Sequence, residues 1–373
     1  MSKKKGLAHN LNVQEYDTPA LILDIEAAER NIKRMGEYFR GKKVHLRPHV
    51  KVHKSPFLAQ KQIAAGAPGI TCAKLSEAEV MANAGIDDIL IANQIVGPYK
   101  LKRLAYLSKQ CKVRVLVDDI ANAREMSKFA TEVGSKIGVL IEVNLFRNLE
   151  GILDRCGVPP GQTAVDLAHE ITGLSGLEFK GLMGYEGSLR KFTTPESRAN
   201  AVKEALQPLI ETKRQIETSG LSVEDVSSGG TMSYDLVSRV EGVTEVEAGS
   251  YVLMDTTYRK YGIDFEYALT ILTGVVSRPR PEKVIVDAGL KTISADHGLP
   301  PINGREDMEC IALNAEHGHY RLSKPSDYPR PGDKLEMLPT HVDTTVCLHD
   351  NYVIARNGKV EAILRIEGRG KLQ

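Results

Sequence analysis

Hydrophobic residues fall into a repeating order along most of the chain. Short runs rich in Val, Ile and Leu are separated by segments whose apolar residues recur every three to four positions. The runs predicted as strands are 44–48, 69–73, 88–93, 113–118, 137–144, 177–185, 224–229 and 245–255, and the clearest helical patterns are 98–110, 119–133, 160–173 and 196–219. Eight strands that alternate with helices predict an α/β fold, a (β/α)8 TIM barrel. The alternative is an open doubly wound sheet, but the glycine-rich turn that it needs after its first strand is missing.

The pattern changes near residue 265. Strand-like runs such as "ALTILTGVVSR" and "KVEAILRIEG" then follow one another through short turns, which predicts a C-terminal antiparallel β domain. One more strand-like run, Pro19–Asp24, precedes a helical pattern that starts at Ile25. Because the barrel needs only eight strands, we assign this run to the β domain. The expected division is a barrel over residues 25–262, with residues 1–24 and 263–373 forming the β domain.

Composition argues against several classes of partner. The formal net charge is +1, with 49 basic and 48 acidic residues, so no basic excess suggests a nucleic acid or a membrane surface as partner. No run approaches the roughly 18 apolar residues of a membrane span. The five cysteines include no C-x-x-C pair, which favours reduced thiols over a disulfide framework. We therefore expect a cytoplasmic protein whose partner is a small molecule.

The stretch "RPHVKVHK", residues 47–54, concentrates basic side chains. If it is extended, Arg47, His49, Lys51 and His53 project from one face. Four basic groups on one face need paired acids or a bound anion. Because the first predicted barrel strand ends here, Lys51 lies just past its C-terminal end, where the active sites of such barrels form.

A second feature suggests what the basic groups hold. The seventh predicted strand runs into "SSGGTMS", residues 227–233, in which Gly229 and Gly230 allow backbone N–H groups to approach an anion. Loops after the seventh and eighth strands of such barrels often bind phosphate, and the eighth strand carries "AGSY". A lysine at a fixed distance from a phosphate suggests pyridoxal phosphate (PLP) bound as a Schiff base. A glycine turn without a ligand and a solvated lysine remain the alternatives.

A candidate metal site lies in "PTHVDTTVCLHD". In an extended segment His341 and Asp343 project to the same side, and an imidazole with a carboxylate can bind a divalent cation. His317 and His319 are a second pair of this kind. The alternative for each pair is an ordinary hydrogen-bonded surface pair.

The longer motifs resemble a known family. They are "DTPALILD", "LRPHVKVHK", "GITCAKLSEAEVMANAGIDDILIAN", "RCGV", "SSGGT", "AGSYVLMD", "DAGLKTISADHGLP", "AEHG" and "PTHVDTTV". In this order they are similar to the D-threonine aldolase and D-serine dehydratase family of fold-type III PLP enzymes, which is related to alanine racemase. The resemblance implies a PLP-binding barrel, a C-terminal β domain, D-configured substrates and a homodimer.

The resemblance also implies roles for particular residues. Lys51 would form the Schiff base, and Arg155 and Tyr185 would lie beside the cofactor ring. His53 would be an acid/base group or a supporting hydrogen-bond partner. The phosphate would be bound by Ser228, Gly229, Gly230, Thr231, Gly249, Ser250 and Tyr251. His341 and Asp343 would hold the metal.

Two positions depart from the family pattern. The segment 145–154, "LFRNLEGILD", is longer and more apolar than usual, which bears on the cofactor contacts near Asn144. Glu186 stands where relatives often carry His or Gln, and this could alter the choice of substrate.

The expected reaction is retro-aldol cleavage of a D-β-hydroxy amino acid to glycine and an aldehyde. In this family a His-x-Asp metal pair points to an aldolase, because a carboxylate suits Mn2+ or Mg2+, with Zn2+ as the alternative. The competing interpretations are a D-serine or D-3-hydroxyaspartate dehydratase, a racemase and a non-catalytic PLP-binding protein. Threonine, phenylserine and 3-hydroxyaspartate all remain open as substrates, and the last would need an extra cation, for which Arg190 and Lys191 are candidates.

Overall fold

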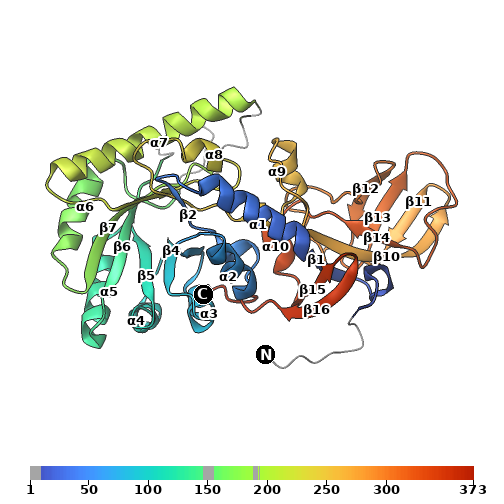
Figure 1. Cartoon of the computed structure of the whole chain (residues 1–373), viewed down its shortest axis with the longest axis horizontal. Coiled ribbons are helices and arrows are strands. Elements are labelled where there is room, and N and C mark those ends of the chain that lie inside the picture. The colour runs from blue at the N-terminus through green and yellow to red at the C-terminus, as the bar shows by residue number, and fades with distance from the viewer. Residues whose placement is uncertain (1–9, 146–154, 188–191, 193) are drawn as a thin grey trace. The chain divides into compact units, whose positions relative to one another are not determined.

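The computed structural model describes residues 10–145, 155–187, 192 and 194–373. The chain divides into two compact units (Figure 1). The barrel unit comprises Gly36–Lys51, Pro56–Gly249 and Lys371–Gln373. The β unit comprises the residues up to Met35, Val52–Ser55 and Ser250–Gly370. Of the helices in the described ranges, none is both long and apolar enough to cross a membrane.

The barrel unit contains eight parallel strands. They are β2 (His45–Leu46), β3 (Ile70–Cys72), β4 (Asp88–Gln94), β5 (Lys112–Val117), β6 (Ile137–Glu142), β7 (Leu177–Met183), β8 (Asp225–Ser228) and β9 (Glu245–Val246). They pair in the order β2-β9-β8-β7-β6-β5-β4-β3. A parallel bridge between His49 and Thr71 joins the first and last strands, with the Thr71 N–H donating to the Pro48 carbonyl at 2.8 Å. The eight predicted barrel strands are confirmed.

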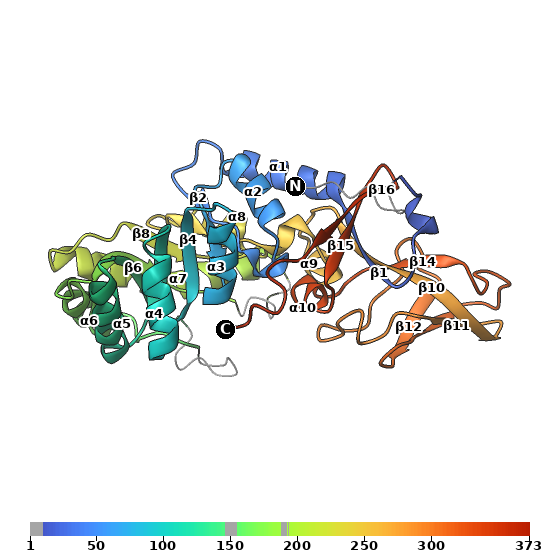
Figure 2. The ribbon, with the colours of Figure 1, turned by 90° about the horizontal axis from the view of Figure 1, so that it is seen from below.

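Helices cover the outside of these strands. The helices of the unit are α2 (Pro56–Ala64), α3 (Leu75–Asn83), α4 (Pro98–Leu107), α5 (Ile120–Val133), α6 (Gln162–Thr172), α7 (Pro195–Thr218) and α8 (Tyr234–Val237). Helices α3 to α6 stand beside one another along the strands (Figure 2). Local sequence sets their ends: the Asp119 side chain accepts from the Asn122 N–H at the start of α5, and Gly134 ends it with φ +65°. The four predicted helices are confirmed to within a few residues.

Two layers fill the barrel differently. At the N-terminal end of the strands, Arg47 and Arg114 form ion pairs with Asp88, Asp225 and Glu245. Nearer the C-terminal end of the strands, an apolar layer is formed by Leu90, Leu116, Leu140 and Met183, and Tyr185 packs against it. The C-terminal end of the barrel therefore rests on a packed interior, which holds the side chains at that end in place.

The β unit is built on one eight-stranded sheet. Its strands are β1 (Ala20–Asp24), β10 (Leu269–Arg280), β11 (Lys283–Val286), β12 (Met308–Leu313), β13 (Gly318–Leu322), β14 (Lys334–Met337), β15 (Asn351–Arg356) and β16 (Lys359–Arg365). The order is β12-β13-β11-β10-β1-β15-β16, and β14 pairs with β10. The prediction of an antiparallel domain is confirmed, apart from the parallel pair of β1 and β15. The early strand β1 thus lies in this sheet between β10 and β15.

Short helices in the β unit correct two predictions. The long strand predicted for 245–255 ends at Val246, and the turn η4 (Ser250–Val252) and helix α9 (Thr256–Lys260) follow. The strand-like run "VCLHDNYVIAR", residues 346–356, forms a strand only from Asn351, because α10 (Val342–Val346) precedes it. Helix α1 (Ile25–Phe39) starts at Ile25, as expected.

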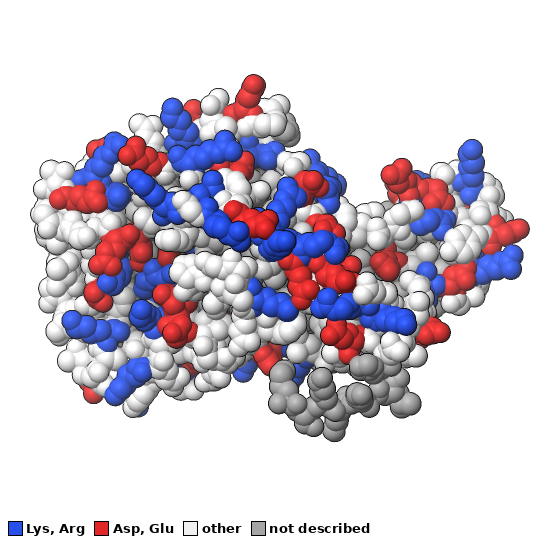
Figure 3. All heavy atoms as spheres, in the orientation of Figure 1, with Lys and Arg blue, Asp and Glu red and all other residues white. Residues whose placement is uncertain are grey.

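Positive and negative side chains are intermixed over the face drawn in Figure 3, in keeping with the net charge of +1.

Candidate active site

Lys51 lies just beyond the C-terminal end of barrel strand β2. Strand β2 ends at Leu46, and the turn η2 (Val50–Val52) carries Lys51. The row of basic groups predicted for this stretch is interrupted, because the backbone follows the strand ladder only as far as His49 and turns at Val50, before Lys51 and His53. Arg47 turns into the barrel and pairs with Asp88 and Glu245, each at 2.7 Å. Its positive charge is therefore neutralised.

Three of the predicted cofactor residues come together in the barrel unit. The guanidinium of Arg155 lies 5.2 Å from the ring centre of Tyr185, which follows β7. A side chain placed on Gly230 would meet the Tyr185 ring and hydroxyl at 3.6 Å. Asn144 helps to fix this arrangement, since its Nδ2 donates to the Arg155 carbonyl at 2.8 Å. The loop after β8 and the Tyr185 ring thus face a common space.

The glycine loop after β8 is organised by Glu186. This carboxylate is only 1% exposed, and it accepts from the Ser228 hydroxyl at 3.0 Å and from the Gly229 N–H at 3.1 Å. It also accepts from the Ser233 hydroxyl. Gly229 has a φ of +80°, which disfavours any residue with a side chain. The residue noted in the sequence as a departure therefore shapes the predicted phosphate loop directly.

The rest of the predicted loop divides between the two units. Thr231 and Gly249 belong to the barrel unit, whereas Ser250 and Tyr251 begin the long β-unit segment. Tyr251 is fully buried, with its ring 5.6 Å from that of Phe265. The Ser250 hydroxyl lies 3.3 Å from that of Tyr258.

An acidic cluster near Arg155 had no signal in the sequence analysis. Gln94 donates to Asp118 at 3.1 Å and to Glu142 at 2.5 Å, at the ends of neighbouring barrel strands. Burial raises the pKa of Glu142, although Gln94 and the charge of Arg155 oppose the shift. The residues of this acidic cluster are far apart in the chain and belong to no recognisable motif.

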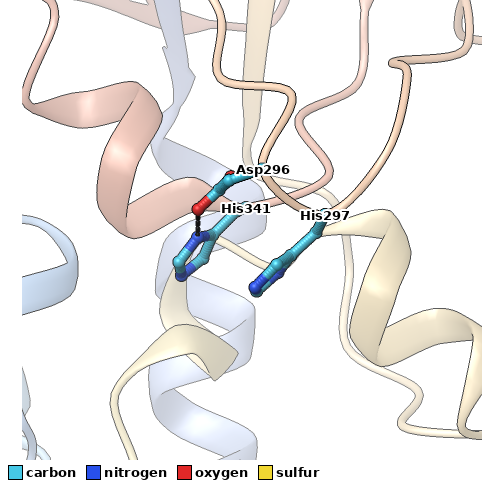
Figure 4. A group of neighbouring side chains, drawn as sticks. All are labelled: Asp296, His297 and His341. Carbon is cyan, nitrogen blue, oxygen red and sulfur yellow. Dashed lines mark hydrogen bonds and ion pairs between the residues drawn. The ribbon is translucent and has the colours of Figure 1, made fainter.

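A second group of polar side chains converges within the β unit. Asp296, His297 and His341 offer ligand atoms that all lie within 4.8 Å of one another (Figure 4). Nδ1 of His341 lies 2.6 Å from Asp296, and the two histidine rings stack with centroids 4.0 Å apart. Burial raises the pKa of Asp296, but hydrogen bonds from Ser294 and His341 outweigh this and lower the pKa to about 2. Among the described residues, this is the one group of three such side chains placed so that they could hold a metal ion.

The predicted partner Asp343 lies on α10, two residues after His341. Because Val342–Val346 is helical, the argument that both residues project from one face of an extended segment was wrong. The Asp343 atom Oδ1 is nevertheless buried without a hydrogen-bond partner. A buried carboxylate oxygen in this state is suited to a cation.

His53, His317 and His319 lie elsewhere in the β unit. His53 is fully buried, and its Nδ1 accepts from the Ser55 N–H at 3.1 Å. His319 lies on β13 next to Asn314, and neither it nor the exposed His317 joins the group around His341. Arg190 and Lys191 lie outside the described residues, as does most of the segment 145–154.

Comparisons with known proteins identify the family. The model of the alanine racemase N-terminal domain matches residues 23–257, and the model of a putative serine dehydratase domain matches residues 268–355. D-threonine aldolase from an Arthrobacter species is 38% identical over 358 residues, which cover 95% of this chain and 93% of that protein. The 3-hydroxy-D-aspartate aldolase of Paracoccus denitrificans strain Pd 1222 is 37% identical, with coverage of 97% and 94%. The crystal structure of D-threonine aldolase from Filomicrobium marinum superposes with a TM-score of 0.93, at 36% identity and coverage of 98% and 99%.

The chain belongs to the D-threonine aldolase and D-serine dehydratase family. The resemblance stated from the motifs is confirmed, and so is its implication of a PLP-dependent lyase acting on D-amino acids. The non-catalytic interpretation loses its support, because these relatives are all named as enzymes.

The residues present fit the cofactor of this family. A lysine and a glycine loop lie at the C-terminal ends of β2 and β8, and Gly230 leaves open the space in front of Tyr185. The candidate metal group of the β unit, Asp296, His297 and His341, was partly missed in the sequence. Asp296 and His297 stand in the quoted motif "DAGLKTISADHGLP", and the adjacent acid and histidine could have suggested them.

Proposed function

We propose that this protein cleaves D-β-hydroxy amino acids, such as D-threonine, to glycine and an aldehyde. PLP would be attached to Lys51, and a divalent cation would be held by His341 and Asp343. The observation that carries the metal-dependent aldolase assignment is an imidazole oriented by Asp296, with an unsatisfied carboxylate oxygen two residues later in the chain. Asp296 occupies Nδ1 of His341 and leaves Nε2 for a ligand, while Oδ1 of Asp343 is buried without a partner. One nitrogen and one oxygen ligand favour Mn2+ or Mg2+ over Zn2+.

Each residue has a defined task in this proposal. Bound PLP supplies an electron sink that weakens bonds to the substrate Cα. Lys51 anchors the cofactor, and the loop Ser228–Thr231 with Gly249, Ser250 and Tyr251 binds its phosphate. Arg155 and Tyr185 hold the ring in one orientation, supported by the Asn144 hydrogen bond to Arg155. A fixed ring decides which substrate bond is broken.

Retro-aldol cleavage needs one base that takes the proton of the substrate hydroxyl. Cleavage removes a proton from the substrate hydroxyl and breaks the Cα–Cβ bond, and Cα later takes up one proton, so no net proton is consumed. His53 is our candidate for this transfer. Its Nδ1 accepts from the Ser55 N–H, which fixes the ring, and an imidazole is the side chain most often used for such a transfer. A cation beside the hydroxyl would make that group easier to deprotonate.

Dehydration is the second candidate reaction. D-threo-3-hydroxyaspartate dehydratase of a Delftia species is 30% identical over 382 residues and covers 94% of this chain. A D-serine or D-3-hydroxyaspartate dehydratase would use the same cofactor and a metal but release ammonia and a 2-oxo acid.

Product analysis decides between the two reactions. Purified protein with PLP and Mn2+ is incubated separately with D-threonine, D-serine and D-3-hydroxyaspartate, and the products are identified. Glycine and acetaldehyde from D-threonine support the aldolase, whereas ammonia and a 2-oxo acid as main products establish the dehydratase. Equal cleavage of L-threonine or L-allo-threonine would contradict the proposed D specificity.

The active form in this proposal is a cytoplasmic homodimer with shared sites. The motive is the resemblance to fold-type III enzymes and the placement of Lys51 and His341 in different units of the chain. Mixing the inactive variants Lys51→Ala and His341→Ala under conditions that allow subunit exchange should restore part of the activity. A fully active monomer would refute the shared site.

A further inference from the structure

The start of helix α9 and the start of helix α10 share one carboxylate, that of Asp255. Its Oδ1 accepts from the Tyr258 N–H at 3.0 Å, which caps α9. Its Oδ2 accepts from the Val342 N–H at 3.3 Å, and Val342 is the first residue of α10. Val342 also stands between His341 and Asp343, the two residues proposed to hold the metal. One side chain therefore joins the two helices at the midpoint of that pair.

The cap of α9 alone does not require a carboxylate at position 255. Asn or Ser caps a helix about as well as Asp and uses a single oxygen to do so. Asp255 is fully buried, where an ionised group is costly unless hydrogen bonds compensate it. Its second oxygen is the atom that reaches α10, so the link to Val342 accounts for an acid at this position.

Thr257 and Thr340 strengthen the same connection. The Thr257 hydroxyl donates to the Thr340 carbonyl at 2.6 Å, one residue before His341. The Thr340 hydroxyl donates to the Gly298 carbonyl at 3.0 Å, one residue after His297. Both threonines are buried, so water does not compete for these bonds. The start of α9 is thus tied by hydrogen bonds to the chain beside both histidines of the candidate metal group.

We propose that Asp255 is a positioning residue for the proposed divalent cation. The proposal rests on the proposed function, in which His341 and Asp343 hold that cation. The carboxylate fixes the backbone at Val342, so the two flanking side chains keep one separation and one direction. Because Oδ1 of Asp343 has no hydrogen-bond partner of its own, the backbone of α10 has to place it. Residues that orient metal ligands in this way commonly change the affinity by about 10- to 100-fold.

The test measures Mn2+ binding to the PLP-loaded full chain after EDTA treatment. In Asp255→Asn, which has the same size but only one acceptor oxygen, the Kd for Mn2+ should rise by about 10- to 100-fold in calorimetry. The matched control is Asp24→Asn, because Asp24 caps α1 with a single oxygen, and its Kd should equal that of the wild type. At saturating Mn2+, the electron paramagnetic resonance spectrum of Asp255→Asn should differ from that of the wild type. A loss of stability alone would leave the spectrum of the folded, loaded protein unchanged.

A second variant separates the hydrogen bond from the charge of Asp255. Val342→Pro removes the N–H donor and keeps the carboxylate. Proline is favoured at the first position of a helix, and the extended backbone of His341, with φ −150° and ψ 106°, suits the residue before a proline. The Kd for Mn2+ should rise in this variant as it does in Asp255→Asn.

The outcomes separate this inference from the proposed function. An unchanged Kd in Asp255→Asn overturns the inference. Weaker binding in that variant with unchanged binding in Val342→Pro also overturns it, because charge and not position would then be the cause. If Asp255→Asn does not fold, as judged by circular dichroism, Val342→Pro decides alone. A wild-type protein that binds no Mn2+ would refute the proposed metal dependence together with the inference, whereas wild-type binding with unchanged variants refutes the inference only.

Discussion

Asp296 accepts a hydrogen bond from Nδ1 of His341 at 2.6 Å, across 45 residues of sequence. The carboxylate selects the tautomer of the imidazole and fixes its ring, which leaves Nε2 as the atom that would bind the proposed metal. Histidine ligands of metals are commonly oriented in this way.

Replacement of Asp296 should weaken metal binding without abolishing it. In Asp296→Asn, the affinity for Mn2+ should fall by about 10- to 100-fold, because an amide orients the ring less firmly. In Asp343→Ala a ligand itself is lost, and neither Mn2+ binding nor Mn2+-dependent activity should be measurable. Calorimetric titration of EDTA-treated protein measures both affinities. Equal affinity in Asp296→Asn and wild type would contradict the orienting role.

Loss of Lys51 should remove covalent attachment of the cofactor. The Lys51→Ala protein should have no borohydride-reducible PLP on any peptide and no measurable cleavage of D-threonine. The matched control is Lys54→Arg, since Lys54 is the other lysine of the motif, and this variant should keep both properties. The prediction fails if reduction labels Lys54 in the wild-type protein.

Neutralising Glu186 should strengthen the binding of PLP. The Glu186→Gln side chain can still accept from Ser228 and Gly229, but it no longer repels a phosphate. We expect the Kd for PLP to fall about fivefold, which corresponds to about 1 kcal/mol. Fluorescence titration of the cofactor-free protein measures this, with Glu224→Gln, an exposed carboxylate beside Lys180, as the control. Weaker binding in Glu186→Gln would show that the charge itself holds the loop.

Removal of Arg47 should destabilise the barrel strongly. Its side chain is 3% exposed and pairs with Asp88 and Glu245, so Arg47→Ala leaves Arg114 alone to balance the three carboxylates of the ion-pair layer. The free energy of unfolding should fall by about 3–5 kcal/mol. Arg124→Ala, which breaks the exposed pair with Glu170, should cost at most about 1 kcal/mol. Urea unfolding followed by circular dichroism compares the two variants, and equal losses would argue against the ion-pair layer as a source of stability.

Local sequence patterns were sufficient for the elements of the barrel unit. Apolar runs such as Val113–Val117 are buried between other strands, so their hydrophobicity is nearly continuous and easy to recognise. The helices carry their own start and stop signals, as Asp119 and Gly134 do for α5. Lys51 and the loop after β8 could be placed because barrel active sites form beyond the C-terminal ends of strands.

Local patterns failed where the conformation depended on distant contacts. The residues after His49 and those of α10 were expected to be extended, because alternation of polar and apolar residues favours a strand. In the folded chain, hydrogen bonds to Val246 and Ala248 hold Arg47 and His49 in the strand ladder, and the turn η2 begins at Val50. A strand persists only where a neighbouring strand pairs with it, and the local pattern does not record where that pairing stops.

The sequence by itself determined the order of strands and helices, the family, and the residues that stand at strand ends with the chemistry for PLP. These properties follow from periodicity and short motifs, which act over a few neighbouring residues. Only the tertiary structure decided that Asp296 and His297 meet His341, and that Glu186 closes on the glycine loop. Such encounters join residues that are tens of positions apart. They depend on how strands pair and loops pack, and no local pattern records this.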